Sequence, residues 1–366
     1  MNLPERESPN RARFAAALDA LVAAAKDDAR TLAGLAAAAE EHGLGMRALE
    51  IATMARNLAP NDAQVRAVTA RAMAAGVPSW HHNILRDLER NAAYRAALEQ
   101  VARPGDRVLD IGAGSGLLSM IAARAGAGQV TACEVNPAVA DAAVRTVAYN
   151  GFADRITIVP RYSTEIELER DLGERVDVIV QEIIAHDMLC EGVLTALADA
   201  VPRFLKPGGR VVPERAQVRA ALAYWPHARA RELDSVEGFD LSPYATLVRY
   251  PLEASSNDPS LVLRSEPVDL FSWDFASGGP YGPGRTSTEQ TVRDGNANGV
   301  IQWIHIDLVE GVTYENAPSR GPNSSWACLF YPFAVGTVPS GTVMRVHGAH
   351  TQIAMRIWAE PGAATA

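Results

Sequence analysis

The sequence predicts three consecutive domains: an all-helical one, a doubly wound α/β domain with a mostly parallel sheet, and an antiparallel β-barrel or sandwich. The pattern of apolar residues changes twice along the 366 residues. It is helical up to residue 76, alternates between strand-like and helical runs from Arg107, and is strand-like between Gly/Pro/Asn-rich loops after residue 213. A chain of this length also exceeds what one core usually serves. We therefore place the domains at residues 1–76, 77–213 and 214–366.

Bulk composition indicates a globular protein and argues against membrane and nucleic-acid partners. Hydrophobic residues make up 48% and charged residues 21%, the formal net charge is −9, and no apolar run is long enough to span a bilayer. The opening MNLPERESPN lacks the regions of a signal peptide, so we expect a cytoplasmic protein without membrane contact. Because no Lys/Arg cluster could neutralise phosphates, nucleic acid is not expected as a partner and a cationic substrate fits better. The cysteines, Cys133, Cys190 and Cys328, are expected to be free thiols.

The helical segment has the spacing of a helical hairpin. Its first part, RFAAALDALVAAAKDDARTLAGLAAAAEEHGLG, ends at a glycine that suits a helix C-cap. The next part has small residues at Ala48, Ala52 and Ala55, followed by Pro60, as in the second helix of a tetratricopeptide unit. A single degenerate unit is equally consistent with generic helical packing.

A glycine-rich loop marks the candidate cofactor site. The segment VLDIGAGSG (108–116) places Gly112, Gly114 and Gly116 between a strand and a helix, where a ligand can lie against bare main chain. Dinucleotide folds use G-x-G-x-x-G in this place, whereas the spacing here is G-x-G-x-G and Asp110 stands two residues before the first glycine. An acid would repel a pyrophosphate but attract the ammonium of a methionine moiety, so we expect S-adenosylmethionine.

A second acid supports this cofactor. Glu134 ends the next strand, where a carboxylate can accept both ribose hydroxyls. The alternative is a solvated carboxylate at the end of a strand.

Two glutamates flank the loop EIIAHDMLCEG at the carboxyl edge of the sheet, where ligands of open α/β sheets bind. A guanidinium is protonated at neutral pH and has no nucleophilic lone pair. Glu182 and Glu191 could hold it by charge-assisted hydrogen bonds, aim one nitrogen at a sulfonium methyl and take up a proton, without any metal. Alternatively, Glu191 caps a helix and Glu182 pairs with a nearby arginine.

These motifs together resemble the protein arginine methyltransferases over roughly residues 78–360, with the monomethylating and tetratricopeptide-bearing branches most similar. A bacterial relative that methylates free arginine is a further possibility. The resemblance implies a Rossmann-like cofactor domain and the paired glutamates of an arginine-binding loop. HHNILRDLERNAAY is similar to the family's helical lid, which implies that Arg90 meets the cofactor carboxylate. STE at 163–165 is similar to a segment that contacts the adenine amine, which implies that role for Glu165.

The β domain carries looser matches and one departure. VEGFDLSPY resembles the family's dimerisation arm, which implies a homodimer. The family's Thr-His-Trp loop falls on Ser324, Ser325 and Trp326, so Trp326 could line the arginine pocket but the histidine is missing. His186 and His350 are candidate substitutes, although a structural role is the commoner one for each. The adjacent pair His81 and His82 does not indicate a metal site, because neighbouring helical side chains diverge.

The function that follows is an arginine ω-N-methyltransferase using S-adenosylmethionine. We prefer free L-arginine as acceptor, giving Nω-methyl-L-arginine, with protein or peptide arginine as the close alternative. A helical segment folded over the pocket would exclude polypeptides, and one folded away would dock them. Two further alternatives are a methyltransferase for another hydroxyl or amine acceptor and a non-catalytic helical-repeat adaptor.

Overall fold

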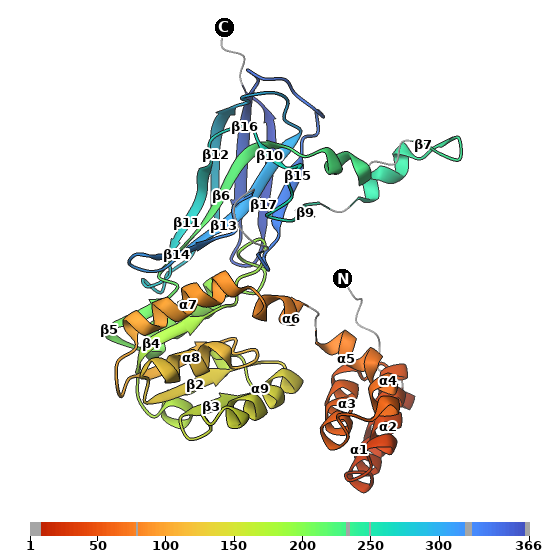
Figure 1. Cartoon of the computed structure of the whole chain (residues 1–366). Coiled ribbons are helices and arrows are strands. Elements are labelled where there is room, and N and C mark those ends of the chain that lie inside the picture. The colour runs from red at the N-terminus through yellow and green to blue at the C-terminus, as the bar shows by residue number, and fades with distance from the viewer. Residues whose placement is uncertain (1–8, 78–79, 232–234, 249, 319–323, 363–366) are drawn as a thin grey trace.

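The computed structural model describes residues 9–77, 80–231, 235–248, 250–318 and 324–362. Figure 1 shows the three parts in chain order: a helical domain, an α/β domain and a β domain with a projecting arm. The predicted fold class is therefore confirmed. Within these ranges, no helix is both long and apolar enough to cross a bilayer.

The helical domain is built on its own core of alanine and aliphatic side chains, which includes Leu18, Leu32 and Ile51. Asp28 and Asp62 cap two of the helices by accepting hydrogen bonds from free backbone N–H groups, as expected for N-cap acids. The helices are α1 (Pro9–Ala24), α2 (Ala29–Glu41), α3 (Gly45–Leu58), α4 (Ala63–Val68) and α5 (Ala70–Gly76).

The α/β domain has a five-stranded parallel sheet with the order β3-β2-β1-β4-β5. This order reverses between β1 and β4, so the loops after these strands open onto one crevice, which is where ligands of such sheets bind. The short helix α6 (Trp80–Leu85) and the longer helix α7 (Leu88–Val101) precede the sheet. The remaining elements are β1 (Arg107–Ile111), α8 (Leu117–Ala125), β2 (Gln129–Cys133), α9 (Pro137–Tyr149), β3 (Ile156–Val159), the 3₁₀ turn η1 (Ser163–Glu165), the π-helical turn η2 (Leu168–Leu172), β4 (Val176–Gln181), α10 (Val193–Phe204) and β5 (Leu205–Val212).

The β domain combines a seven-stranded and a three-stranded antiparallel sheet. The long strands β6 (Arg215–Tyr224) and β13 (Gly299–Val309) pair along nine residues at its centre. The other sheet strands are β9 (Leu252–Ala254), β10 (Val262–Leu263), β11 (Val268–Asp274), β12 (Gly284–Thr291), β14 (Val312–Glu315), β15 (Cys328–Pro332), β16 (Val343–His350) and β17 (Met355–Pro361). The arm consists of η3 (Pro226–Arg231), the hairpin strands β7 (Ser235–Val236) and β8 (Phe239–Asp240), and η4 (Ser242–Leu247), and it projects away from the sheets in Figure 1.

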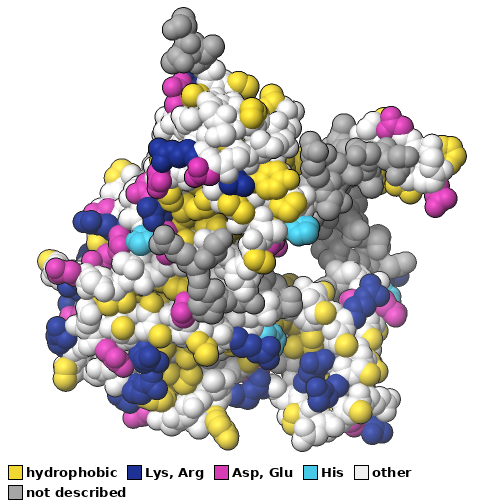
Figure 2. Space-filling view, turned by 45° about the horizontal axis from the view of Figure 1, so that its top comes forward, with side chains coloured by type: hydrophobic (Ala, Val, Ile, Leu, Met, Phe, Trp, Pro, Cys, Tyr) yellow, Lys and Arg dark blue, Asp and Glu magenta, His cyan; other side chains and the backbone are white. Residues whose placement is uncertain are grey.

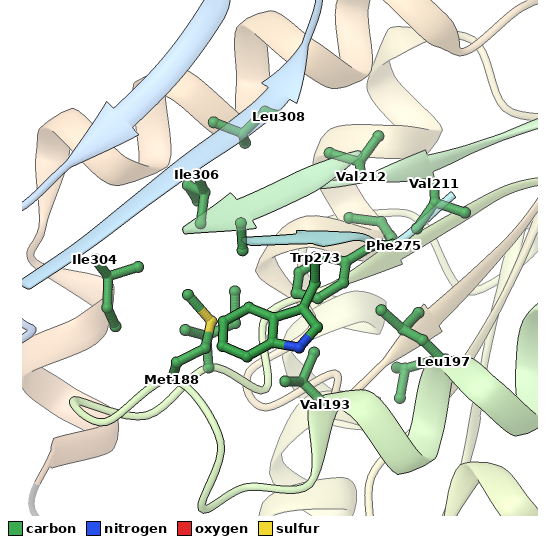
Figure 3. Close-up of a cluster of buried hydrophobic side chains, with 14 of the residues drawn as sticks. Met188, Val193, Leu197, Val211, Val212, Trp273, Phe275, Ile304, Ile306 and Leu308 are labelled. Carbon is green, nitrogen blue, oxygen red and sulfur yellow. The ribbon is translucent and has the colours of Figure 1, made fainter. Parts of the chain in front are cut away.

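A shared hydrophobic core joins the α/β and β domains. In Figure 3 the indole of Trp273 lies among Met188 and Val193 from one domain and Ile304 from the other. Met188 belongs to the loop between the two predicted glutamates, so this core fixes that loop against the β domain. Because close-packed interiors transmit displacement, the two domains position the loop as one body.

Candidate active site

A cavity of about 930 Å³ lies at the carboxyl edge of the parallel sheet. Its wall brings together the glycine loop, Glu134, Arg90 and both Glu182 and Glu191. A volume of this size is within the usual range for small-molecule sites. Residues that belong to separate sequence motifs therefore line the same cavity.

The glycine loop forms the cavity floor with backbone that other residues would rarely adopt. Gly112 and Gly114 have φ values of 79° and 53°. A Cβ on Gly112 would collide with the side chain of Ile183, whereas a Cβ on Gly114 would meet nothing within 4 Å. The first glycine thus permits close packing of the loop, and the second leaves open space over bare main chain for a ligand.

Glu134 ties the glycine loop to the end of β2. One carboxylate oxygen accepts a hydrogen bond from Gly114 N at 3.0 Å and the other accepts from Asn136 N at 2.8 Å. The side chain is buried and lines the cavity, so its remaining lone pairs face the ligand space. This position suits the predicted contact with ribose hydroxyls, which stays a prediction.

Arg90, near the start of α7, pairs with Glu182. Its guanidinium is 3% exposed, and Nη1 lies 2.7 Å from Glu182 Oε2. Nη2 donates to the Ile84 carbonyl and to Asn91 Oδ1. Across the part of the chain that the structure describes, Arg90 Nε and Glu182 Oε1 lack hydrogen-bond partners. Buried polar atoms of this kind normally have partners, so both are available to ligands, and Arg90 Nε can serve the predicted contact with a cofactor carboxylate.

Glu182 and Glu191 differ in their surroundings. Burial raises the pKa of Glu182, and the Arg90 guanidinium offsets part of this effect. Glu191 is exposed at the surface. Desolvation by the surrounding residues nevertheless raises the pKa of Glu191 to about 7, and the negative charges of Asp187 and Glu134 contribute to this increase. The alternative role of Glu191 as a helix cap is wrong, because the N-cap of α10 is Gly192 and no side chain caps this helix. The alternative pairing of Glu182 with an arginine is present, and it lies inside the cavity.

Comparisons with known proteins agree with this geometry. A sequence model of the family described as ribosomal protein L11 methyltransferase (PrmA) matches residues 95–213. The chain is 34% identical over 293 residues to "Arginine N(omega)-methyltransferase" from Streptomyces achromogenes subsp. streptozoticus, which covers 79% of this chain and 80% of that protein. The chain belongs to the arginine N-methyltransferase family.

This chain spans a smaller share of the length of other relatives. Protein arginine N-methyltransferase 7 from Oryza sativa subsp. indica is 31% identical, over 66% of this chain but only 37% of that protein. Two solved structures share the fold. A Trypanosoma brucei PRMT1 enzyme-prozyme heterotetrameric complex with AdoHcy has a TM-score of 0.64 at 22% identity and covers 77% of this chain and 97% of its own. The crystal structure of PRMT6 has a TM-score of 0.62 at 20% identity, with 76% and 97% covered.

The protein is thus an S-adenosylmethionine-dependent arginine N-methyltransferase, and its own residues fit that cofactor. The open space over Gly114 and the free Nε of Arg90 supply a cradle and a donor for an anionic group. Among the described residues, no group of three or more His, Cys, Asp or Glu side chains could hold a metal ion.

Asp110 is more deeply buried than its predicted contact with the methionine ammonium requires. It is 0% exposed, is absent from the cavity wall, and accepts a hydrogen bond from Ser119 Oγ at 2.5 Å. Burial raises the pKa of Asp110 to about 6 against the lowering effect of Ser119. Its Oδ1 has no hydrogen-bond partner in the described ranges. The ammonium contact stays a prediction.

Glu165 also lies apart from the cavity. Its exposed carboxylate turns back to accept a hydrogen bond from Tyr162 N at 3.1 Å. Tyr162, Ser163 and Thr164 line the cavity instead. The adenine contact of Glu165 stays a prediction that requires its side chain to turn.

Trp326 is not among the cavity-lining residues of this arginine methyltransferase. The side chain is 2% exposed and meets the Tyr314 ring edge-on, with centroids 5.4 Å apart. The contact between Trp326 and arginine therefore stays a prediction, because in this arrangement the side chain does not line the cavity.

Asp87 contacts Ser325, the residue on which the family's missing histidine falls. Its Oδ2 accepts hydrogen bonds from Tyr314 OH at 2.7 Å, Ser325 N at 2.9 Å and Ser325 Oγ at 3.1 Å. Its Oδ1 caps α7 by accepting from Arg90 N. Asp87 therefore joins the helix that carries Arg90 to the loop that precedes Trp326.

Of the two candidate substitutes for the histidine, His186 contacts the residue that follows Trp326. Its Nδ1 accepts a hydrogen bond from Ala327 N at 3.0 Å. His350 is buried in the β domain with its ring edge-on to Phe271 and Trp273, which is a structural role.

Sequence reasoning missed one end of the cavity. His81 and His82 line it together with Met73 and Val77 from the end of the helical domain. Burial lowers the pKa of His81, and the Glu134 carboxylate opposes this shift. The sequence signal for this end is the pair of histidines beside the lid motif, whose adjacency argues against a metal site but not against a place in the cavity wall.

Proposed function

We propose that the enzyme methylates a terminal guanidino nitrogen of free L-arginine. The observation that carries this proposal is the presence of Glu182 and Glu191 in one cavity with the glycine loop and Glu134. A cationic acceptor and a sulfonium cofactor can thus be held side by side by carboxylates.

The two carboxylates have different tasks in this proposal. Glu182, fixed by Arg90, holds the guanidinium in one orientation, which is the positioning that an in-line displacement requires. S-adenosylmethionine supplies an electrophilic methyl group and leaves as the neutral thioether. Glu191 accepts the proton that the arginine nitrogen loses as its bond to the methyl carbon forms, then releases it to solvent. Its raised pKa makes it a better proton acceptor than an ordinary carboxylate.

Two observations support a free amino acid as acceptor. The Streptomyces relative, whose printed name specifies arginine itself, matches along 80% of its length, whereas the protein-methylating relative from rice matches along 37%. In addition, Met73, Ala75 and Gly76 of the helical domain contribute to the cavity wall, so the helices lie against the pocket. This is the arrangement expected to hinder a polypeptide.

Mass spectrometry tests the choice of acceptor directly. The purified enzyme with S-adenosylmethionine is offered free L-arginine in one reaction and an arginine-rich peptide in another. We expect a gain of one methyl mass on free arginine and a much slower reaction, or none, on the peptide. Preferential methylation of the peptide would overturn the free-arginine proposal while leaving the arginine chemistry intact.

We also propose that the enzyme works as a homodimer in the cytoplasm. Support for the dimer comes from the arm, which exposes Val236, Phe239, Tyr244 and Leu247. Figure 2 shows apolar side chains at the tip of the arm. Exposed apolar groups on a projecting element usually mark an interface.

Light scattering tests the proposed dimer. It should give the mass of a dimer for the wild type and of a monomer for Phe239→Ser; a monomeric wild type would refute the proposed dimer.

A further inference from the structure

The end of the helical domain forms part of the cavity that holds the cofactor. Met73, Ala75, Gly76 and Val77 line the same space as Gly114 and Glu134. These residues precede the segment matched by the methyltransferase family model, which begins at residue 95. The helical domain therefore adds a wall to a cofactor site that the α/β domain otherwise builds.

A chain of hydrogen bonds links this wall to the glycine loop. Asn136 Nδ2 donates to the carbonyl of Gly76 at 2.7 Å. Asn136 N donates to Glu134 Oε1 at 2.8 Å, and Glu134 Oε2 accepts from Gly114 N at 3.0 Å. Three consecutive bonds thus connect the last residue of α5 to the glycine loop. A shift of α5 would disturb the Glu134 carboxylate, for which we predict the ribose contact.

Gly76 is also held firmly from the other side. A Cβ at this position would collide with the side chain of Leu49, which is buried in α3. The Gly76 carbonyl is therefore presented to Asn136 by the packed body of the helical domain. A second bond between the domains, from Asn57 Nδ2 to Asp141 Oδ2 at 3.0 Å, joins α3 to α9 at an exposed position.

We infer that the helical domain is a functional part of the cofactor site and that Asn136 is the positioning residue that couples them. Asn136 itself lines the cavity, and it bonds to Gly76 on one side and to Glu134 on the other. The domain keeps the apolar wall of Met73 and Val77 against the bound cofactor, which slows cofactor release. Loosening the Asn136–Gly76 bond weakens cofactor binding and leaves the chemical step unchanged once the cofactor is saturating.

The substitutions Asn136→Ser and Asn136→Asp separate this coupling from the second role of Asn136. The Asn136 side-chain oxygen caps α9 by accepting hydrogen bonds from Ala138 N and Val139 N. Ser and Asp are comparable N-cap residues, so both variants keep a capping oxygen but lose the amide that donates to Gly76. Asn150→Ser is the matched control, because Asn150 Nδ2 donates to the Thr146 carbonyl at the other end of the same helix.

Calorimetric titration with S-adenosylhomocysteine is the first measurement. We expect Asn136→Ser and Asn136→Asp to raise the dissociation constant by roughly three- to tenfold, the range for loss of one hydrogen bond, and Asn150→Ser to leave it unchanged. In kinetics, the KM for S-adenosylmethionine should rise with kcat nearly constant. An unchanged dissociation constant in both Asn136 variants, or an equal loss in Asn150→Ser, would overturn the inference.

Hydrogen exchange provides a readout independent of activity and of any single variant. In the wild type, S-adenosylhomocysteine should slow exchange of the backbone amides of residues 70–77, and this protection should shrink in Asn136→Ser. Protection limited to the α/β domain in the wild type would show that the helical wall does not contact the cofactor and would overturn the inference. Equal melting temperatures of wild type and variant would establish that the fold is intact.

Discussion

The cofactor end and the acceptor end of the cavity are held in different ways. At the cofactor end, backbone geometry predominates: Gly114 leaves space, and both Glu134 oxygens are already engaged by backbone N–H groups. At the acceptor end, side-chain charges predominate: Glu182 pairs with Arg90, and Glu191 has a raised pKa. The first end is therefore preformed for binding, whereas the second depends on protonation and pairing. Variants should accordingly affect binding at one end and turnover at the other.

The largest expected effect comes from removing charge at the acceptor end. Glu182→Gln and Glu191→Gln should each lower kcat by roughly 10²–10⁴-fold, because a neutral amide neither fixes the guanidinium nor takes its proton. The dissociation constant for S-adenosylhomocysteine should change little. Glu169→Gln, at an exposed acid elsewhere, is the control. Wild-type turnover in both active-site variants would refute the assigned roles.

Gly114→Val should show the opposite pattern at the cofactor end. The new side chain would project into the open space above the loop, and the positive φ is unfavourable for a β-branched residue. Calorimetry should show binding of S-adenosylhomocysteine weakened by at least about tenfold, which corresponds to about 1.4 kcal/mol.

A second glycine separates backbone strain from ligand exclusion. Gly151 has a φ of 77° and open space at its Cβ position, but it is not part of the cavity wall. Gly151→Val should therefore lower stability without weakening cofactor binding. Equal losses of affinity in the two valine variants would contradict the site assignment.

The pH dependence of kcat/KM for arginine should reflect the acceptor end alone. Glu182 and Glu191 must both be ionised to hold the cation; burial raises the pKa of Glu182 and raises that of Glu191 to about 7. Activity should therefore be present above about pH 7 and fall as pH decreases through that value, by at least about tenfold per unit. An ordinary glutamate would keep activity down to about pH 4.3. A profile that is flat between these two values, with S-adenosylmethionine saturating, would contradict the raised pKa.

The difference between the two ends also explains what the sequence could predict. The glycine loop and Glu134 lie at the ends of adjacent parallel strands, so local spacing indicates both their position and their chemistry. The paired glutamates are predictable for the same reason. The wall at Met73 and Val77 was not predictable, because it depends on how a separate domain packs. The buried position of Trp326 was not predictable either, since it depends on contacts between segments distant in the sequence.

Asp87 bonds to Tyr314 and Ser325, which are distant from it in the sequence. Variants at these contacts should have the smallest of the effects predicted here. Asp87→Asn removes a charge that accepts three hydrogen bonds from Tyr314 and Ser325, and it places an amide N–H among donors. It should lower the free energy of unfolding by roughly 1–3 kcal/mol. Ser325→Ala removes only the hydroxyl bond and should cost roughly 0.5–1.5 kcal/mol. Denaturant unfolding measures both.

The same pair of variants tests whether the acceptor end depends on this long-range contact. Because Asp87 joins the helix that carries Arg90 to the loop before Trp326, weaker bonds to Tyr314 and Ser325 in Asp87→Asn should lower kcat as well as stability, with little change in the affinity for S-adenosylhomocysteine. Ser325→Ala keeps the Asp87 carboxylate and its bonds to Tyr314 OH and Ser325 N, so it should keep kcat within about twofold. If Ser325→Ala lost as much turnover as Asp87→Asn, the serine hydroxyl itself would be performing the role of the missing histidine.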